Sequence, residues 1–271
     1  MSSNLIRRIE EQMGRAIPQV PANEAHFAKV GYHAEADRVL ALSLRSCGLQ
    51  QVPDAVWELK SLQVLSLGEN EIEELPGRIS ELRHLMQFYL FNNPITKLPE
   101  EISELLELEI LDIGHNALNS LPESIGKLKN LQFLYVSDNK LSALPSSLGD
   151  LQSLIYLSMT DNQFAELPAP VYRLRSLKEL RIYNNQLTQL PDDIGQLSEL
   201  RELHARGNQL TELPEAIGEL QNLYYLDLRG NLLSALPEGV GKLKELRKLD
   251  LRWNPIASNP PTNFEDCIVY T

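Results

Sequence analysis

The chain has 271 residues, of which 43% are hydrophobic and 23% are charged, and its formal net charge is −12. This acidic balance argues against nonspecific binding to nucleic acid and against adsorption to anionic membranes, because both need a basic surface. No stretch approaches the roughly 18 apolar residues of a transmembrane helix, so we expect no membrane-spanning segment.

The first 38 residues predict an N-terminal cap made of a helix and a strand. Residues 3–14 predict a short amphipathic helix that stops at a glycine. Residues 29–44 predict two strands joined at Glu35–Asp37, the second of which enters the repeats described next. A helix that docks a partner is the alternative to a cap. Arg7 and Arg8 interrupt the first apolar run, so we do not expect a secretory signal peptide. The apolar side of the helix consists of Leu5, Ile6, Ile9 and Met13.

A 23-residue period governs residues 39–260. Nine asparagines recur at this interval without a slip, and one further step back falls on Cys47. A fixed period of about 20–50 residues is the signature of a solenoid, in which stacked repeats share one core. The asparagines are Asn70, Asn93, Asn116, Asn139, Asn162, Asn185, Asn208, Asn231 and Asn254.

Every repeat has the same internal order. Leucines or other apolar residues three and five positions before the asparagine predict a short strand with these side chains inward. The asparagine follows at a turn, where its amide can both accept and donate, so we expect a ladder of asparagine side chains that joins neighbouring turns. A proline six residues after the asparagine, from Pro53 to Pro260, predicts the first position of a 3₁₀ or α-helical turn.

The resulting consensus is L-x-x-L-x-L-x-x-N-x-L-x-x-L-P-x-x-I-G-x-L-x-x. It resembles the leucine-rich repeat of the 23-residue kind, which is shared by Sur-eight-type Ras scaffolds, plant intracellular Ras-group proteins and stand-alone prokaryotic repeat proteins. The resemblance covers roughly residues 39–260. It implies an α/β solenoid of about ten repeats, with parallel strands on a curved concave face and short helical turns on the convex face.

The repeat pattern stops at Asn259 and Pro261, so residues 261–271 predict a C-terminal cap with a β-prone run at its end. Cys47 and Cys267 lie nine repeat steps apart. At ~4.8 Å per step they are too distant for a disulfide, which needs Cα atoms within about 7 Å. The absence of disulfide staples favours a reducing cytoplasm, with secretion without a cleaved signal as the alternative.

The positions six, four, two and one before each asparagine should face outward on the concave side, the usual binding surface of such arcs. Aromatic residues collect at these positions from the third repeat onward, and clusters of this kind are typical interface anchors. Alternatively, Phe91 only covers Gly68 and Gly114, its neighbours in the same column. The aromatic candidates for partner binding are Tyr89, Phe91, Phe133, Tyr135, Tyr156, Tyr183 and Tyr225.

The last four repeats are richer in cations at the same positions. They predict a polar site for acidic residues of a partner, anchored by Trp253 at the rim. The alternative is an Asp–Arg ladder that satisfies itself, because Asp227 and Asp250 stand two residues before arginines. The cationic and rim candidates are Arg181, His204, Arg206, Arg229, Arg252 and Trp253.

Catalytic motifs are lacking. The five histidines lie in different repeats or segments, no Cys/His group has metal-ligand spacing, and no phosphate-binding glycine loop occurs. We therefore predict a non-enzymatic, monomeric module without metal or cofactor that binds a protein partner on its concave face. Alternatives are a scaffold or regulator of Ras-like GTPases, the recognition module of a host-targeting bacterial effector, and a passive structural repeat without a partner.

Overall fold

The computed structural model describes residues 2–24, 28–258 and 267–271. Its contacts divide the chain into two compact parts, Met1–Tyr135 and Val136–Thr271, which we call the N-terminal half and the C-terminal half. In the described residues, no helix combines the length and apolar character needed to span a bilayer. The sequence predictions that fall on His26, Asn259, Pro260 and Pro261 lie outside the described residues.

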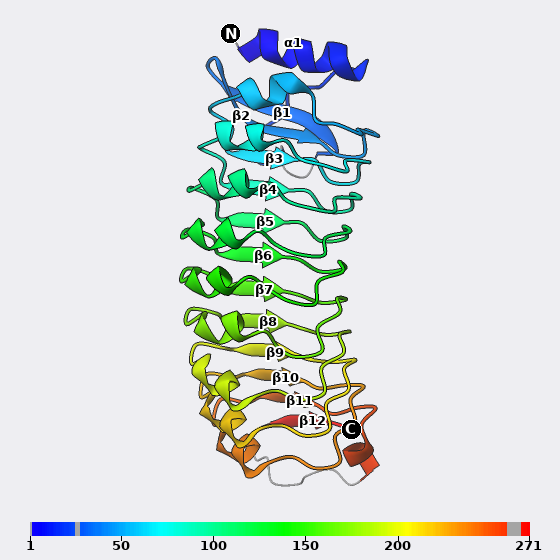
Figure 1. The fold of residues 1–271 in the computed structure, drawn as a ribbon, viewed down its shortest axis with the longest axis vertical. Coiled ribbons are helices and arrows are strands. Elements are labelled where there is room, and N and C mark those ends of the chain that lie inside the picture. Colours follow the sequence, from blue (N-terminus) through cyan, green and yellow to red (C-terminus); the bar gives the residue numbers. More distant parts are fainter. Residues whose placement is uncertain (1, 25–27, 259–266) are drawn as a thin grey trace. The chain divides into compact units, whose positions relative to one another are not determined.

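The N-terminal half begins with helix α1 (Ser2–Met13), one residue earlier than predicted. It ends at Gly14, whose φ of 65° is the left-handed conformation that glycine adopts at helix ends. Ile6 and Ile9 are buried under the helix, and α1 packs on the first 3₁₀ helix (Figure 1). The predicted pair of strands is an antiparallel hairpin of β1 (Val30–Glu35) and β2 (Arg38–Leu44).

Each repeat then contributes a strand of three residues, and within each half the strands lie side by side in chain order (Figure 1). Adjacent repeat strands are parallel, as predicted for a leucine-rich-repeat solenoid. The strands of the N-terminal half are β3 (Val64–Ser66), β4 (Gln87–Tyr89), β5 (Ile110–Asp112) and β6 (Phe133–Tyr135). Those of the C-terminal half are β7 (Tyr156–Ser158), β8 (Glu179–Arg181), β9 (Glu202–His204), β10 (Tyr225–Asp227) and β11 (Lys248–Asp250). The β-prone run after the repeats forms β12 (Ile268–Tyr270), which pairs in parallel with β11.

The helical turns are 3₁₀ helices. The proline lies directly before the helix rather than at its first position, which corrects the sequence prediction. The Pro53 carbonyl accepts the Val56 N–H at 2.9 Å and so closes the first turn. The helices are η1 (Asp54–Glu58), η2 (Gly77–Glu81), η3 (Glu100–Glu104), η4 (Glu123–Lys127), η5 (Ser146–Asp150), η6 (Ala169–Arg173), η7 (Asp192–Gln196), η8 (Glu215–Glu219), η9 (Glu238–Lys242) and η10 (Pro255–Ser258).

The inward residues of strands and helices form the core of each half. Leu65 and Leu111 in one half, and Leu203 and Leu226 in the other, are fully buried. Phe88, the one departure from leucine at this position, is equally buried. No repeat could bury these side chains alone, so stacking supplies the hydrophobic stabilisation.

The predicted asparagine ladder is present. The Asn93 Oδ1 accepts the Ile72 N–H of the preceding turn at 3.0 Å. Its Nδ2 donates to the carbonyl oxygens of Leu67 at 3.1 Å and Leu90 at 2.9 Å. Each amide therefore satisfies backbone groups of two successive turns. Cys47 takes the first place in this series, and its own N–H donates to the Asn70 Oδ1 at 2.9 Å.

Candidate functional site

The outward positions of the repeats form one face of the strands in each half, which we call the strand face. It comprises the residues six, four, two and one before each asparagine. Sequence analysis predicted that all four positions belong to a strand. This is wrong for the positions two and one before the asparagine, because each strand ends four residues before it. The residue directly before the asparagine has a positive φ, as at His115 (53°) and Trp253 (62°). The strand face therefore combines strand and turn.

Exposure along the strand face differs from expectation at the position four before the asparagine. Asp227 and Asp250 are each only 1% exposed, whereas an outward strand position was predicted to be open. Arg181 and His204 occupy the same position and are half-buried. The longer side chains that follow cover the aspartates.

In the N-terminal half, an aspartate stands among the predicted aromatic residues. Asp112 on β5 is the cross-strand neighbour of Tyr89 on β4 and Tyr135 on β6. Its Oδ1 accepts the Gly114 N–H at 3.1 Å. Burial raises the pKa of the Asp112 carboxyl above its ordinary value, against the opposing effects of this hydrogen bond and of His115. Burial, with Asp112 and Tyr135 nearby, also raises the pKa of the Tyr89 hydroxyl. No sequence motif pointed to Asp112 as a site residue.

Phe91 covers the glycine of the neighbouring repeat. A Cβ added at Gly68 would lie 2.7 Å from the Phe91 ring, so the ring occupies the space that a side chain would need. The Arg45 guanidinium also lies over the Phe91 ring, 5.0 Å from the ring centroid. Arg45 also pairs with Glu69 at 2.6 Å. The sequence alternative that Phe91 covers neighbouring glycines is thus confirmed for Gly68.

In the C-terminal half, two of the predicted arginines are part of an Asp–Arg ladder. Arg229 donates to both oxygens of Asp227 at 2.8 and 2.6 Å, and Arg252 donates to both oxygens of Asp250 at 2.9 and 2.6 Å. The Arg229 Nε also lies 3.5 Å from Asp250. Burial alone would raise the pKa of Asp227, but hydrogen bonds from Arg229, with His204 nearby, hold it well below its usual range.

Arg206 differs from these arginines. Its guanidinium lies over the Tyr183 ring, 4.4 Å from the centroid, and among the described residues no carboxylate lies within 4.0 Å of it. It lines an open hollow of about 210 Å³ on the strand face. The other residues that line the hollow are Arg181, Tyr183, His204, Tyr225, Asp227 and Arg229.

His204 lies at the floor of this hollow between carboxylates. Its Nε2 is 3.0 Å from a Glu202 oxygen and 3.7 Å from a Glu179 oxygen, and its Nδ1 is 4.0 Å from Asp227. The Tyr225 ring stands edge-on against the imidazole, with centroids 5.0 Å apart. Sequence analysis selected neither glutamate, because only the cross-strand register brings Glu179 beside Glu202.

The remaining candidates lie around these sites. Arg181 pairs with Glu179 at 2.6 Å and lies over the Tyr156 ring. Trp253 is 74% exposed and the Arg252 guanidinium lies 5.7 Å from its ring centroid, consistent with a place at the rim. Phe133, the cross-strand neighbour of Ile110, belongs to the N-terminal half and lies outside the hollow.

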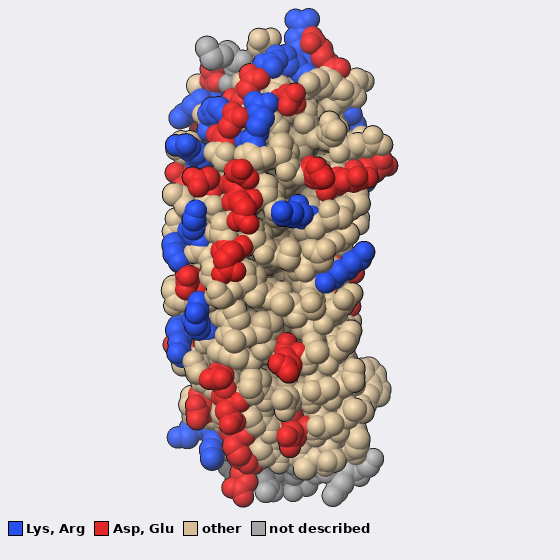
Figure 2. All heavy atoms as spheres, in the orientation of Figure 1, with Lys and Arg blue, Asp and Glu red and all other residues tan. Residues whose placement is uncertain are grey.

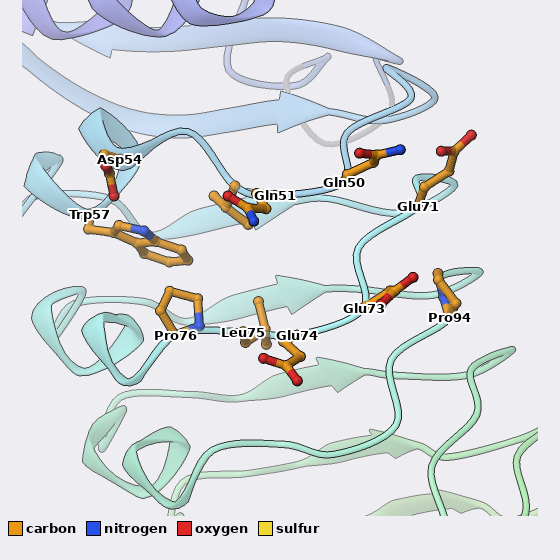
Figure 3. A pocket seen from close by; sticks show the side chains of 11 residues that line it. Gln50, Gln51, Asp54, Trp57, Glu71, Glu73, Glu74, Leu75, Pro76 and Pro94 are labelled. Atoms are coloured by element: carbon orange, nitrogen blue, oxygen red, sulfur yellow. The ribbon is translucent and has the colours of Figure 1, made fainter.

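The N-terminal half has a larger hollow of about 780 Å³ away from the strand face. Figure 3 shows it between two successive turns, with Trp57 and Pro76 at one end and Glu71 and Glu73 near the other. Acidic side chains gather at this level of the surface, beside β3 and β4 (Figure 2). The larger hollow is therefore acidic. Trp57, which lines it, is fully buried and offers no surface for contact with a ligand.

The repeat geometry agrees with the family comparison. A family model described as "Leucine-rich repeat region" matches residues 88–158 and 192–261, and models described as "Leucine rich repeat" match residues 38–95 and 176–197. The chain belongs to the leucine-rich-repeat family. No curated protein sequence matches it.

Solved structures similar to this chain include plant receptor ectodomains. The plant peptide hormone receptor RGFR1 in complex with RGF2 is 31% identical, with a TM-score of 0.68, and the match covers 81% of this chain and 37% of that one. The ectodomain of the receptor kinase GASSHO1/SCHENGEN3 from Arabidopsis thaliana, in complex with CASPARIAN STRIP INTEGRITY FACTOR 2, is 28% identical, with a TM-score of 0.75, and covers 94% and 33%. The chain thus spans about a third of the length of these receptor chains.

A plant ice-binding protein, 22% identical with a TM-score of 0.72 over 93% of this chain and 86% of its own, shares the fold.

Proposed function

We propose that the chain is a non-enzymatic interaction module that binds a protein or peptide partner on the strand face of its C-terminal half. Arg206 carries this proposal. Its guanidinium is oriented by Tyr183 and has no carboxylate within 4.0 Å among the described residues, while Arg229 and Arg252 are held by buried aspartates. A partner's carboxylate can bind Arg206 without breaking an existing ion pair.

The surroundings suit a peptide-sized acidic group rather than a large flat surface. The hollow is open, and Tyr183 and Tyr225 offer aromatic contact beside the cation. Charge-assisted hydrogen bonds are the stronger class of polar contact, and arginine with tyrosine is the usual composition of interface hot spots. The complexes formed by the similar receptor ectodomains support a peptide or protein ligand.

The test is quantitative capture of partners from the source cell by immobilised chain. We expect Arg206→Gln and Tyr183→Ala each to reduce capture of the main partner by about tenfold or more, the scale of a charged hydrogen bond. Arg201→Gln is the matched control, because Arg201 is an exposed arginine of the same repeat outside the hollow. Equal capture by wild type and Arg206→Gln would contradict the proposal.

The captured partner also separates the finer roles. A Ras-like GTPase would support a signalling scaffold, and a protein of a foreign host would support an effector's recognition module. Both roles use the same face, so the variants serve for either.

For the compartment and the assembly state, we propose a cytoplasmic monomer. Cys47 and Cys267 are both free, and burial raises the pKa of each thiol, which slows oxidation. Light scattering of the purified chain, with and without reductant, should give the mass of one chain in both conditions. A dimer would contradict the monomer, and loss of either free thiol in protein from the source cell would contradict the compartment.

A further inference from the structure

The C-terminal half brings three metal-ligating side chains together from two neighbouring strands. β8 and β9 are parallel, and their register pairs Glu179 with Glu202 and Arg181 with His204. Glu202 and His204 are two residues apart and therefore point to the same face of β9. Glu179 lies beside Glu202, so both carboxylates and the imidazole meet on the strand face.

The donor atoms are close to the spacing that a metal ion requires. One atom from each of Glu179, Glu202 and His204 lies within 4.8 Å of the other two. The His204 Nε2 is 3.0 Å from one carboxylate and 3.7 Å from the other. A tetrahedral zinc ion with bonds of ~2.0–2.1 Å places its ligand atoms about 3.4 Å apart. Small side-chain movements would therefore complete the coordination.

The second nitrogen of the imidazole faces a buried carboxylate. The Nδ1 of His204 lies 4.0 Å from the Asp227 carboxylate, which is 1% exposed and fixed by Arg229. This is an ion-pair distance rather than a hydrogen bond, and a movement of about 1 Å would give the carboxylate–histidine hydrogen bond that orients a ligating ring. The edge-on Tyr225 ring further limits its rotation.

We propose that Glu179, Glu202 and His204 form a binding site for a divalent transition-metal ion, with Zn²⁺ the best fit, open toward the hollow beside Arg206. One nitrogen and two carboxylate donors suit zinc rather than Ca²⁺ or Mg²⁺, which take oxygen ligands. Three protein ligands leave a position for water or for a donor from a partner. The site does not depend on the proposed partner, because its ligands belong to this chain alone.

One cation competes with the metal. Arg181 holds Glu179 at 2.6 Å. The Glu179 carboxylate nevertheless retains lone pairs for a second contact. Arg181→Met is therefore expected to strengthen zinc binding, although Arg181 lines the hollow in which a partner would bind.

The test is calorimetric titration of chelator-treated protein with ZnCl₂, together with the visible absorption spectrum of the Co²⁺-substituted protein. We expect one ion per chain, at least about tenfold weaker binding in Glu202→Gln and in His204→Ala, and loss of the Co²⁺ bands in His204→Ala. His84→Ala is the matched control, because His84 lies 3.1 Å from Glu107 but has no second carboxylate in such a group among the described residues. Circular dichroism verifies that each variant is folded.

Three outcomes would overturn the site. These are absence of stoichiometric Zn²⁺ binding by wild type, equal binding by wild type and His204→Ala, and displacement of the zinc by an equal concentration of Ca²⁺ or Mg²⁺. The first would mean that the cluster is an ion-paired histidine, and the last would mean a nonspecific acidic surface.

Discussion

Asp112 and Asp227 occupy the same position of the repeat, four residues before the asparagine, in different halves of the molecule. The pKa of Asp112 is raised and the pKa of Asp227 is lowered. The difference comes from the residue two positions later, which is Gly114 in one half and Arg229 in the other. A repeat therefore supplies a fixed place for a carboxylate, and its neighbour on the strand face decides whether burial of the charge is costly or compensated.

The largest effect expected from this comparison is that of Arg229→Ala. The change removes the guanidinium that pairs with the buried Asp227, and it also removes the contact of Arg229 with Asp250. Removing one partner of a buried ion pair typically costs about 3–5 kcal/mol of the free energy of unfolding. Urea denaturation at neutral pH measures it, with Arg206→Ala as a control that should lose less than about 1 kcal/mol. Equal losses in both variants would contradict the ladder. Because Arg229→Ala is expected to destabilise the fold, Arg229 is a poor probe of partner binding.

The asparagine ladder should behave alike in the two halves. Asn93→Ala and Asn162→Ala each remove one acceptor and one amide donor group from buried backbone partners. We expect each to lower the free energy of unfolding by about 3 kcal/mol, since buried backbone groups lose their hydrogen bonds. Denaturation of both variants measures the losses, with the exposed Gln163→Ala as the control. A difference of more than about 1 kcal/mol between the halves would show that the ladder is not equivalent in the two halves.

Gly68→Ala should reveal how tightly Phe91 is packed. The added Cβ would lie 2.7 Å from the ring, and overpacking of this kind costs about 1–3 kcal/mol. Thermal denaturation should show that Phe91→Ala in the same chain recovers most of the loss. If the double variant is no more stable than Gly68→Ala, the contact is not the cause.

The smallest effect is that of removing the charge at Asp112, and its sign is opposite to that of the same change at Asp227. The pKa of Asp112 is raised on folding. Its contribution to the free energy of unfolding is therefore most favourable below the ordinary carboxyl pKa and falls as pH rises through the raised pKa. Asp112→Asn should therefore stabilise the chain at pH 7, by up to about 1 kcal/mol. The stability contributed by Asp227 is present above the ordinary pKa and is lost as pH falls through its lowered pKa, so Asp227→Asn should destabilise at pH 7.

Urea denaturation of the Asp112→Asn and Asp227→Asn variants from pH 3 to pH 8 measures these effects. At the acid end of this range Asp112→Asn should no longer differ from wild type. The same sign for both variants at pH 7 would contradict the comparison.

The period of the sequence was sufficient to predict the fold. The spacing of Asn93 and Asn162 located the strands, the turns and the inward leucines, because each repeat must satisfy the same backbone groups and bury the same edge. The helix Ser2–Met13 and the hairpin after it were also predictable from apolar spacing and turn residues.

The candidate site was predictable only in part. Counting back from the asparagine placed Tyr183, His204 and Arg206 on one face, and the structure shows that they line one hollow. It could not tell Arg206 from Arg229, because the difference depends on whether an aspartate lies two residues earlier and is buried. The grouping of His204 with two glutamates also needed the cross-strand register, since Glu179 lies in another repeat.

Hydrogen–deuterium exchange of the chain, alone and with its captured partner, tests most directly whether the strand face of the C-terminal half is the binding surface. We expect the partner to slow exchange in residues 181–184, 204–207 and 227–230, which form the strand ends and turns around Arg206. Protection confined to the 3₁₀ helices, or to the N-terminal half, would contradict it.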